Sequence, residues 1–242
     1  MHKLLKQMLL LAMCCFAFAS QAMADERSDA YIAYSVGDYE KAEKLYRPLA
    51  EQGDAIAQLL LAGMYEDGHG VPQDYKEAVK WFRLAADQGD AGAQFGLGLM
   101  YYKGQGVLQD YKEAIRLFKL AAGQGFTYVQ LMLGGIYIEG TSSTQDYKEA
   151  AKWYRLAAEQ GDARAQGMLA VLYNEGLGVP QNYVLAHMWM NISASNVDDK
   201  YQKKFIARRD GLAKKLTAQQ IAEAQELAKK CTANKFKGCE QL

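Results

Sequence analysis

The chain has 242 residues, of which 50% are hydrophobic and 23% are charged. Its length excludes a peptide hormone and is sufficient for one elongated or one globular domain. The 28 basic and 28 acidic residues give a formal net charge of zero, so no excess of positive charge favours nucleic acid, and we expect no nucleic-acid partner.

Residues 1–24 have the features of a secretory signal peptide. Lys3 and Lys6 form a short positive region, and an apolar run without charges extends from Leu9 to Ala19. Ala22-Met23-Ala24 then fits the small-x-small rule for signal peptidase. We expect cleavage after Ala24 and export of the mature chain, either to a bacterial periplasm or to the outside as a secreted protein.

Two alternatives to a cleaved signal remain open. An uncleaved membrane anchor would need a longer apolar run followed by stop-transfer charges, so we expect no transmembrane span in the mature chain. A lipid anchor would use Cys14 or Cys15, although Met13 and Cys14 are poor residues to precede a cysteine modified in this way.

A repeat of 36 residues follows a predicted N-terminal capping helix at residues 25–37. The complete copies span residues 38–73, 74–109, 110–145 and 146–181, and a partial copy spans residues 182–195. A single helix pair cannot bury its own apolar face, so neighbouring copies must stack on one another. The repeat therefore predicts an all-α solenoid of antiparallel helix pairs.

Each repeat predicts two helices. In the second repeat the first helix starts at Asp74 and ends near Gly89, and Asp90 can cap the second helix. Asp74 and Glu77 have the spacing of a capping box, in which each side chain bonds the other residue's backbone N–H. Aligned aromatic residues predict packing between repeats, namely Trp81, Trp153 and Trp189, and Tyr65, Tyr101, Tyr137 and Tyr173.

A glycine pair, as in GHG at residues 68–70, recurs after the second helix of nearly every repeat. A phosphate-binding loop would be a single copy that follows a strand, with backbone N–H groups converging on the anion. These loops follow helices and lack the Lys-Ser/Thr ending of a P-loop. We therefore interpret the first glycine as the end of a helix and the loop as a joint.

The pattern DYKEAxKWxRLAAxQGDAxAQxxLxxxYxxGxGVxQ resembles the Sel1-like repeat, a relative of the tetratricopeptide repeat. The resemblance implies a right-handed α-superhelix whose first helices line a concave surface. It also implies an adaptor or scaffold that binds a protein or peptide there, in envelope assembly, signalling or host interaction. The third repeat departs from the pattern at Phe126-Thr127 and at Thr141-Ser142-Ser143-Thr144.

Basic residues recur on one side of the first helices at a spacing of i, i+4 and i+7, so they share a face. A concave surface of one sign attracts an acidic partner. The alternative is a solvated face whose charges pair with Glu77, Glu113 and Glu149. The partner-binding candidates, called the basic set below, are Lys76, Lys80, Arg83, Lys112, Arg116, Lys119, Lys148, Lys152 and Arg155.

Phe126 and Tyr128 are further partner-binding candidates, because exposed aromatic side chains can anchor a partner. Phe126 stands where the other complete repeats have an aspartate that can cap the second helix. The alternative is that both rings cover a local gap.

Residues 196–242 predict C-terminal capping helices and a tail. KYQKKFIARRDGLAKKL forms a basic helix, and Thr217 with Gln220 predicts a capping box before the next helix. In an oxidising compartment Cys231 and Cys239 are expected to form a disulfide, and a free reactive pair is the alternative.

No motif in the sequence indicates catalysis, and we expect no catalytic, metal-binding or cofactor-binding residues. His69 and His187 lack a metal-ligand spacing, and the Ser-x-x-Lys motif of serine β-lactamases is absent. Some secreted proteins with the resembled repeat are linked to β-lactam binding or hydrolysis, so a cell-wall or β-lactam hydrolase remains an alternative by analogy. A binder of anionic polysaccharide is a second alternative.

Overall fold

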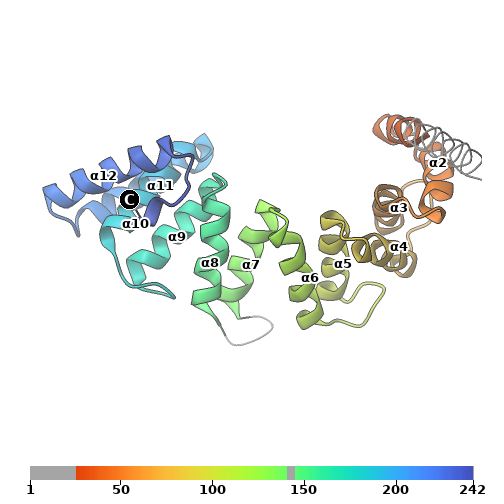
Figure 1. The fold of residues 1–242 in the computed structure, drawn as a ribbon, viewed down its shortest axis with the longest axis horizontal. Coiled ribbons are helices and arrows are strands. Elements are labelled where there is room, and N and C mark those ends of the chain that lie inside the picture. The colour runs from red at the N-terminus through yellow and green to blue at the C-terminus, as the bar shows by residue number, and fades with distance from the viewer. Residues whose placement is uncertain (1–25, 141–144, 242) are drawn as a thin grey trace, which may run out of the picture. The chain divides into compact units, whose positions relative to one another are not determined.

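The computed structural model describes residues 26–140 and 145–241, and every regular element within those ranges is a helix (Figure 1). Consecutive helices pack on one another in pairs. The predicted fold class, an all-α solenoid of helix pairs, is confirmed. The predicted signal peptide at residues 1–24 and the Thr141–Thr144 loop lie outside the described residues.

The helices form two compact bodies, and the boundary between them falls within α6 (Tyr111–Gly123) after Leu117. The N-terminal body contains helical residues 26–35, α2 (Tyr39–Glu51), α3 (Ala55–Asp67), α4 (Tyr75–Asp87), α5 (Ala91–Lys103) and the start of α6. The C-terminal body contains the rest of α6, α7 (Thr127–Glu139), α8 (Tyr147–Ala158), α9 (Ala163–Glu175), α10 (Tyr183–Asn196), α11 (Asp199–Ala213), α12 (Ala218–Ala233) and the 3-10 turn η1 (Cys239–Gln241).

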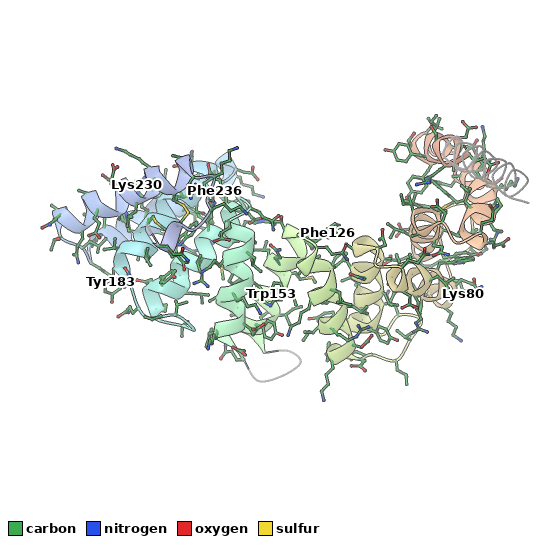
Figure 2. All side chains as sticks on the ribbon, in the orientation of Figure 1. Lys80, Phe126, Trp153, Tyr183, Lys230 and Phe236 are labelled. Carbon is green, nitrogen blue, oxygen red and sulfur yellow. A yellow bond between two sulfur atoms is a disulfide. The ribbon has the colours of Figure 1, made fainter. Side chains whose placement is uncertain are left out.

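Small and large apolar residues fill the core of both bodies at the same repeat positions. One leucine of each second helix is buried, namely Leu61, Leu97, Leu133 and Leu169. Each such leucine contributes about 1.5–3 kcal/mol relative to an exposed one. The predicted packing role of Trp81, Trp153 and Trp189 agrees with their burial (Trp153 is labelled in Figure 2).

Aspartates cap α2 to α5, α8 and α9, but the predicted capping box at Asp74 is only half formed. The Asp74 carboxylate accepts the backbone N–H groups of Lys76 and Glu77 at 2.9 and 3.2 Å. The reciprocal half is replaced, because the Asp74 N–H already donates to the Tyr65 carbonyl at 3.0 Å. Glu77 instead accepts from Lys80 Nζ at 3.1 Å, a charge-assisted bond.

The first glycine of each loop ends a second helix in the left-handed conformation, as predicted from GHG: Gly68, Gly104, Gly140 and Gly176. The second glycine has a different reason, which the sequence pattern did not indicate. A Cβ added at Gly106 (φ +72°) would lie 2.2 Å from the carbonyl oxygen of Tyr75, at the start of α4. Only glycine therefore lets the loop pack against the first turn of its own repeat.

A buried glutamine in each second helix, absent from our predictions, bonds the first helix of its repeat, and Gln58 and Gln130 also bond the neighbouring repeat. Gln58 donates from Nε2 to the Ala50 carbonyl at 3.0 Å and accepts from Gln88 of the next repeat at 2.8 Å. Gln160 donates to Gln130 at 2.8 Å in the same way. Because a buried amide must be hydrogen-bonded, these contacts fix the register between neighbouring repeats.

The C-terminal helices α11 and α12 both pack on α10, the helix of the partial repeat. The capping box of Thr217 and Gln220 forms as predicted. Cys231 and Cys239 are joined in a disulfide with a Cα–Cα distance of 4.9 Å, drawn in yellow in Figure 2. The short tail after α12 is therefore fastened to the end of that helix.

A search of the described residues for a helix long and apolar enough to cross a membrane found none.

Candidate partner-binding surface

The basic set falls into three groups according to position along the first helices. The first group, Lys76, Lys112 and Lys148, lies in the first turn of each helix and is exposed. Among the residues that the structure describes, no ion pair involves these three ammonium groups. Their charge is therefore available to solvent or to a partner.

The second group pairs with glutamates three residues earlier in the same helix. Lys80 lies 3.1 Å from Glu77, and Arg116 lies 2.6 Å from Glu113. Lys152 pairs with Glu149 in the same way at 3.4 Å. These cations are more than half exposed, and such surface pairs typically contribute less than about 1 kcal/mol. The alternative prediction of a solvated, glutamate-paired face thus describes this group of the basic set.

The third group contacts tyrosines of the second helix in the same repeat. Arg83 donates from Nη2 to the Tyr101 hydroxyl at 2.8 Å. Lys119 lies 5.4 Å from the centre of the Tyr137 ring, and its hydrogen bond to that tyrosine raises the lysine pKa. The tyrosines of this column, predicted as packing residues, therefore also position cations.

Arg155 is engaged by the chain itself. Its Nη2 donates to the Tyr173 hydroxyl at 3.2 Å, and its Nε donates to Glu240 in η1 at 2.7 Å. The side chains of Arg155 and Glu240 are only 33% and 18% exposed. Burial and the neighbouring Glu240 carboxylate raise the pKa of Tyr173 to about 12. Arg155 thus differs from the open position expected from the sequence, because the disulfide-fastened tail covers it.

The two aromatic candidates lie at the start of α7. Phe126 is 43% exposed and Tyr128 is 57% exposed (Phe126 is labelled in Figure 2). Phe126 occupies the N-cap position and provides no side-chain cap, whereas Asp90 caps α5 by accepting the Ala93 N–H at 2.7 Å. The third repeat therefore exchanges a helix cap for an exposed ring.

The structure describes two histidines, His69 and His187. His69 stacks on Tyr39 with ring centres 4.2 Å apart. Burial, followed by the charge of Arg209, lowers the pKa of His187. No group of three or more metal-ligating side chains was found within residues 26–140 and 145–241.

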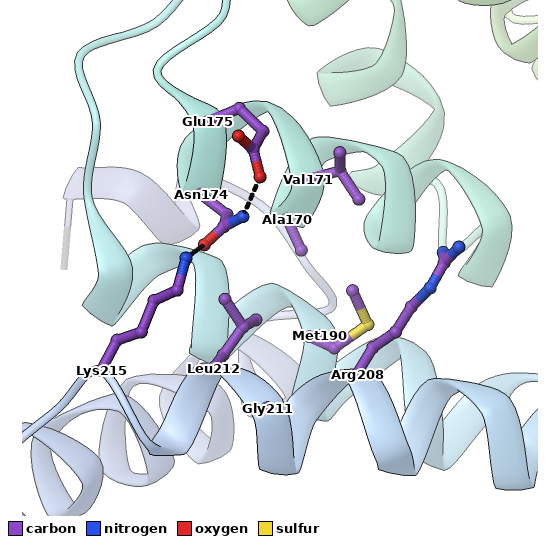
Figure 3. A pocket seen from close by; sticks show the side chains of 9 residues that line it. All are labelled: Ala170, Val171, Asn174, Glu175, Met190, Arg208, Gly211, Leu212 and Lys215. Carbon is purple, nitrogen blue, oxygen red and sulfur yellow. Dashed lines mark hydrogen bonds between the residues drawn. The ribbon is translucent and has the colours of Figure 1, made fainter.

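A cavity of about 310 Å³ lies between α9, α10 and α11 in the C-terminal body (Figure 3). Its floor is apolar and includes Met190 and Leu212. Lys215 donates to Asn174 at 2.8 Å at one end, and Arg208 lies at the other end (Figure 3). The cavity is separate from the basic set and was not predicted from the sequence.

Known proteins share this repeat. The protein-family model of the Sel1 repeat matches residues 34–54, 55–90, 91–126, 127–162 and 163–198. A Sel1 repeat protein from Oxalobacter formigenes is 34% identical with a TM-score of 0.67, and the match covers 71% of each chain. The protein c5321, a protective antigen present in uropathogenic Escherichia coli strains and displaying an SLR fold, is 37% identical with a TM-score of 0.67. That match covers 76% of this chain and 40% of c5321. A search of curated proteins gave no match.

Proposed function

The chain belongs to the Sel1 repeat family, and from this premise we propose that it is an exported scaffold that binds an acidic protein or peptide through the basic set. Sel1 repeat proteins are generally non-catalytic scaffolds for protein–protein interaction. The family resemblance implies that the first helices line a concave surface, and we assign the partner to that surface.

One observation supports the acidic partner above the others. Exposed cations recur at the same positions of successive first helices, and those of the first group, Lys76, Lys112 and Lys148, have no ion pair within the described part of the chain. Electrostatic attraction between exposed charges extends over a Debye length of about 8 Å at physiological salt. Exposed cations repeated on several first helices therefore favour a protein or peptide with several carboxylates over a single anion.

Export is supported by the sequence of residues 1–24 and by the disulfide between Cys231 and Cys239, because thiols in the cytosol are kept reduced. Intact mass of the chain purified from the envelope fraction tests export. The proposal expects a chain that begins at Asp25 and contains the disulfide, and a cytosolic chain that retains residues 1–24 contradicts it.

Partner binding is tested by affinity capture from envelope extract with three versions of the chain. The first is native, and the second carries Lys80→Glu, Arg83→Glu and Arg116→Glu in the N-terminal body. The third carries the same charge change at exposed positions elsewhere, Lys203→Glu, Lys204→Glu and Lys230→Glu. Arg155 is left unchanged because its replacement would remove the bond that it makes to Glu240 of the tail.

The proposal expects one or a few acidic proteins to be captured by the native chain and the control variant, and lost from the first-helix variant. Equal capture by all three versions contradicts the role of the basic set. Retention of acidic glycans in place of proteins would favour the polysaccharide alternative. We propose no catalytic function, and turnover of a chromogenic β-lactam by the purified chain would contradict that choice.

A further inference from the structure

A cation at the repeat position of Arg83 pairs with a tyrosine in every complete repeat, including Arg47 of the first repeat, which lies outside the basic set. The cation is always 18 residues before the tyrosine in the sequence. The pairs are Arg47–Tyr65, Arg83–Tyr101, Lys119–Tyr137 and Arg155–Tyr173. In each pair the tyrosine holds the cation across the two helices of one repeat.

Two of the arginine pairs divide their donors in the same way. Arg155 gives Nη2 to Tyr173 and Nε to Glu240. Arg47 gives Nη2 to Tyr65 at 2.8 Å and Nε to Glu43 at 2.5 Å. The two carboxylates come from different places, one from the same helix and one from the distant tail. The tyrosine thus orients the guanidinium, and the Nε donor takes a carboxylate.

The lysine pair also combines a tyrosine with a carboxylate, although lysine has a single ammonium group in place of separate Nη2 and Nε donors. Lys119 Nζ lies 4.0 Å from Glu149 of the next repeat. Within the described residues, three of the four cation–tyrosine pairs therefore have a carboxylate of the same chain beside the cation.

Arg83–Tyr101 is the exception. Arg83 gives Nη2 to Tyr101 at 2.8 Å, and no carboxylate accepts from its Nε within the described residues. Val79 occupies the position that Glu43 has in the first repeat. Glu113, which corresponds to Glu149, is held by Arg116 at 2.6 Å. Arg83 is exposed, so a partner can reach its side chain.

We propose that the Arg83–Tyr101 pair is a carboxylate-binding site that takes a glutamate or aspartate side chain of an acidic peptide partner. The carboxylate accepts from Arg83 Nε in the way that Glu240 accepts from Arg155. The inference rests on the proposed function and names a recognition element within it. Glu240 is accordingly the chain's own occupant of the equivalent site in the fourth repeat.

The tail that carries Glu240 acts as a ligand within the same chain, because it supplies the carboxylate that Arg155 binds. The disulfide of Cys231 and Cys239 fastens it directly before Glu240. Lys235 and Phe236 between the two cysteines have φ values of 51° and 64°, which residues other than glycine rarely adopt. The ordinary backbone preferences of this loop do not favour its conformation, so the disulfide and the bond of Glu240 to Arg155 hold the tail in place.

The site is tested by observing the arginine Nε–Hε resonances of the ¹⁵N-labelled full chain by NMR. The probe is the hexapeptide Glu-Ser-Glu-Ser-Glu-Ser, and the control peptide has glutamine in place of glutamate. The native chain is compared with Arg83→Lys, which keeps the charge and removes the Nε donor, and with Tyr101→Phe, which removes the hydroxyl. Glu240→Ala removes the acceptor of Arg155 Nε and so vacates the Arg155 site, and circular dichroism checks that each variant is folded.

The proposal expects the acidic peptide, and not its glutamine control, to shift the Arg83 resonance. Arg83→Lys and Tyr101→Phe should weaken peptide binding at least about fivefold, since a charge-assisted hydrogen bond or its orientation is lost. In Glu240→Ala the Arg155 resonance should respond as well.

The inference is overturned if the Arg83 resonance does not move, or if Arg83→Lys binds the peptide with native affinity. If Lys80→Glu with Arg116→Glu abolishes binding while Arg83→Lys does not, the proposed acidic partner stands and only the site fails. If the native chain does not bind the acidic peptide, both the site and the acidic character of the partner fail.

Discussion

Replacement of Gly106 by alanine should destabilise the N-terminal body by about 2–5 kcal/mol. Gly106 has φ +72°, and the left-handed conformation costs a residue with a Cβ about 1–2 kcal/mol. The new Cβ would lie 2.2 Å from the Tyr75 carbonyl oxygen, a backbone atom that cannot rotate away. The loop must therefore lift from the start of α4, and a forced overlap of this kind typically costs a further 1–3 kcal/mol, roughly.

Gly53→Ala is the matched control, because Gly53 has φ +96° but nothing lies within 4 Å of an added Cβ. This variant should lose only the conformational part, about 1–2 kcal/mol. Urea unfolding followed by circular dichroism measures both losses. Equal losses in the two variants would refute the argument that the second loop glycine is required by close packing.

Three further predictions concern the C-terminal body, stability at high pH and the third repeat. Replacement of Cys231 and Cys239 by serine should lower stability by about 2.5 kcal/mol, since the loop closes over a separation of 8 residues; an unchanged urea midpoint contradicts this. Phe126→Asp should raise the stability of α7 by about 1 kcal/mol by supplying the missing cap, and a loss shows instead that the ring covers a gap. Burial raises the pKa of Tyr46, Tyr154 and Tyr173 to about 12 in the folded chain, above the unfolded value of 10. Their contribution to stability is therefore present below pH 10 and is lost as the pH rises toward 12. Urea midpoints should fall over this range, and constant midpoints contradict the assignment to these three tyrosines.

The helices could be predicted from the sequence because their signals are local. Asp90 is followed directly by the helix that it caps, and Gly104 follows the helix that it ends. The period of 36 residues then extends one such assignment to every repeat. Local signals failed at Asp74, where the N–H that a capping box needs is taken by Tyr65 of the preceding helix. A rule based on two residues of one helix contains no information about a carbonyl that another helix supplies.

The candidate site was predictable in residue type but not in detail. The basic set and its alternation with glutamates can be identified from helical spacing alone. The contact between Arg155 and Glu240 joins residues 85 positions apart, and nothing in the local pattern indicates it. The constant spacing of 18 residues between cation and tyrosine is visible in the sequence. The tyrosine column predicts only packing, because spacing does not distinguish an apolar contact from a hydroxyl that orients a guanidinium.

The central claim, that the first helices bind a partner, is tested most directly by photocrosslinking in cells. A photoreactive residue placed at position 112, on a first helix, is compared with the same residue at position 203 on α11, since both positions are exposed lysines. The account predicts a covalent adduct with an acidic protein from position 112 and not from position 203. Adducts from position 203 with none from position 112 would contradict it.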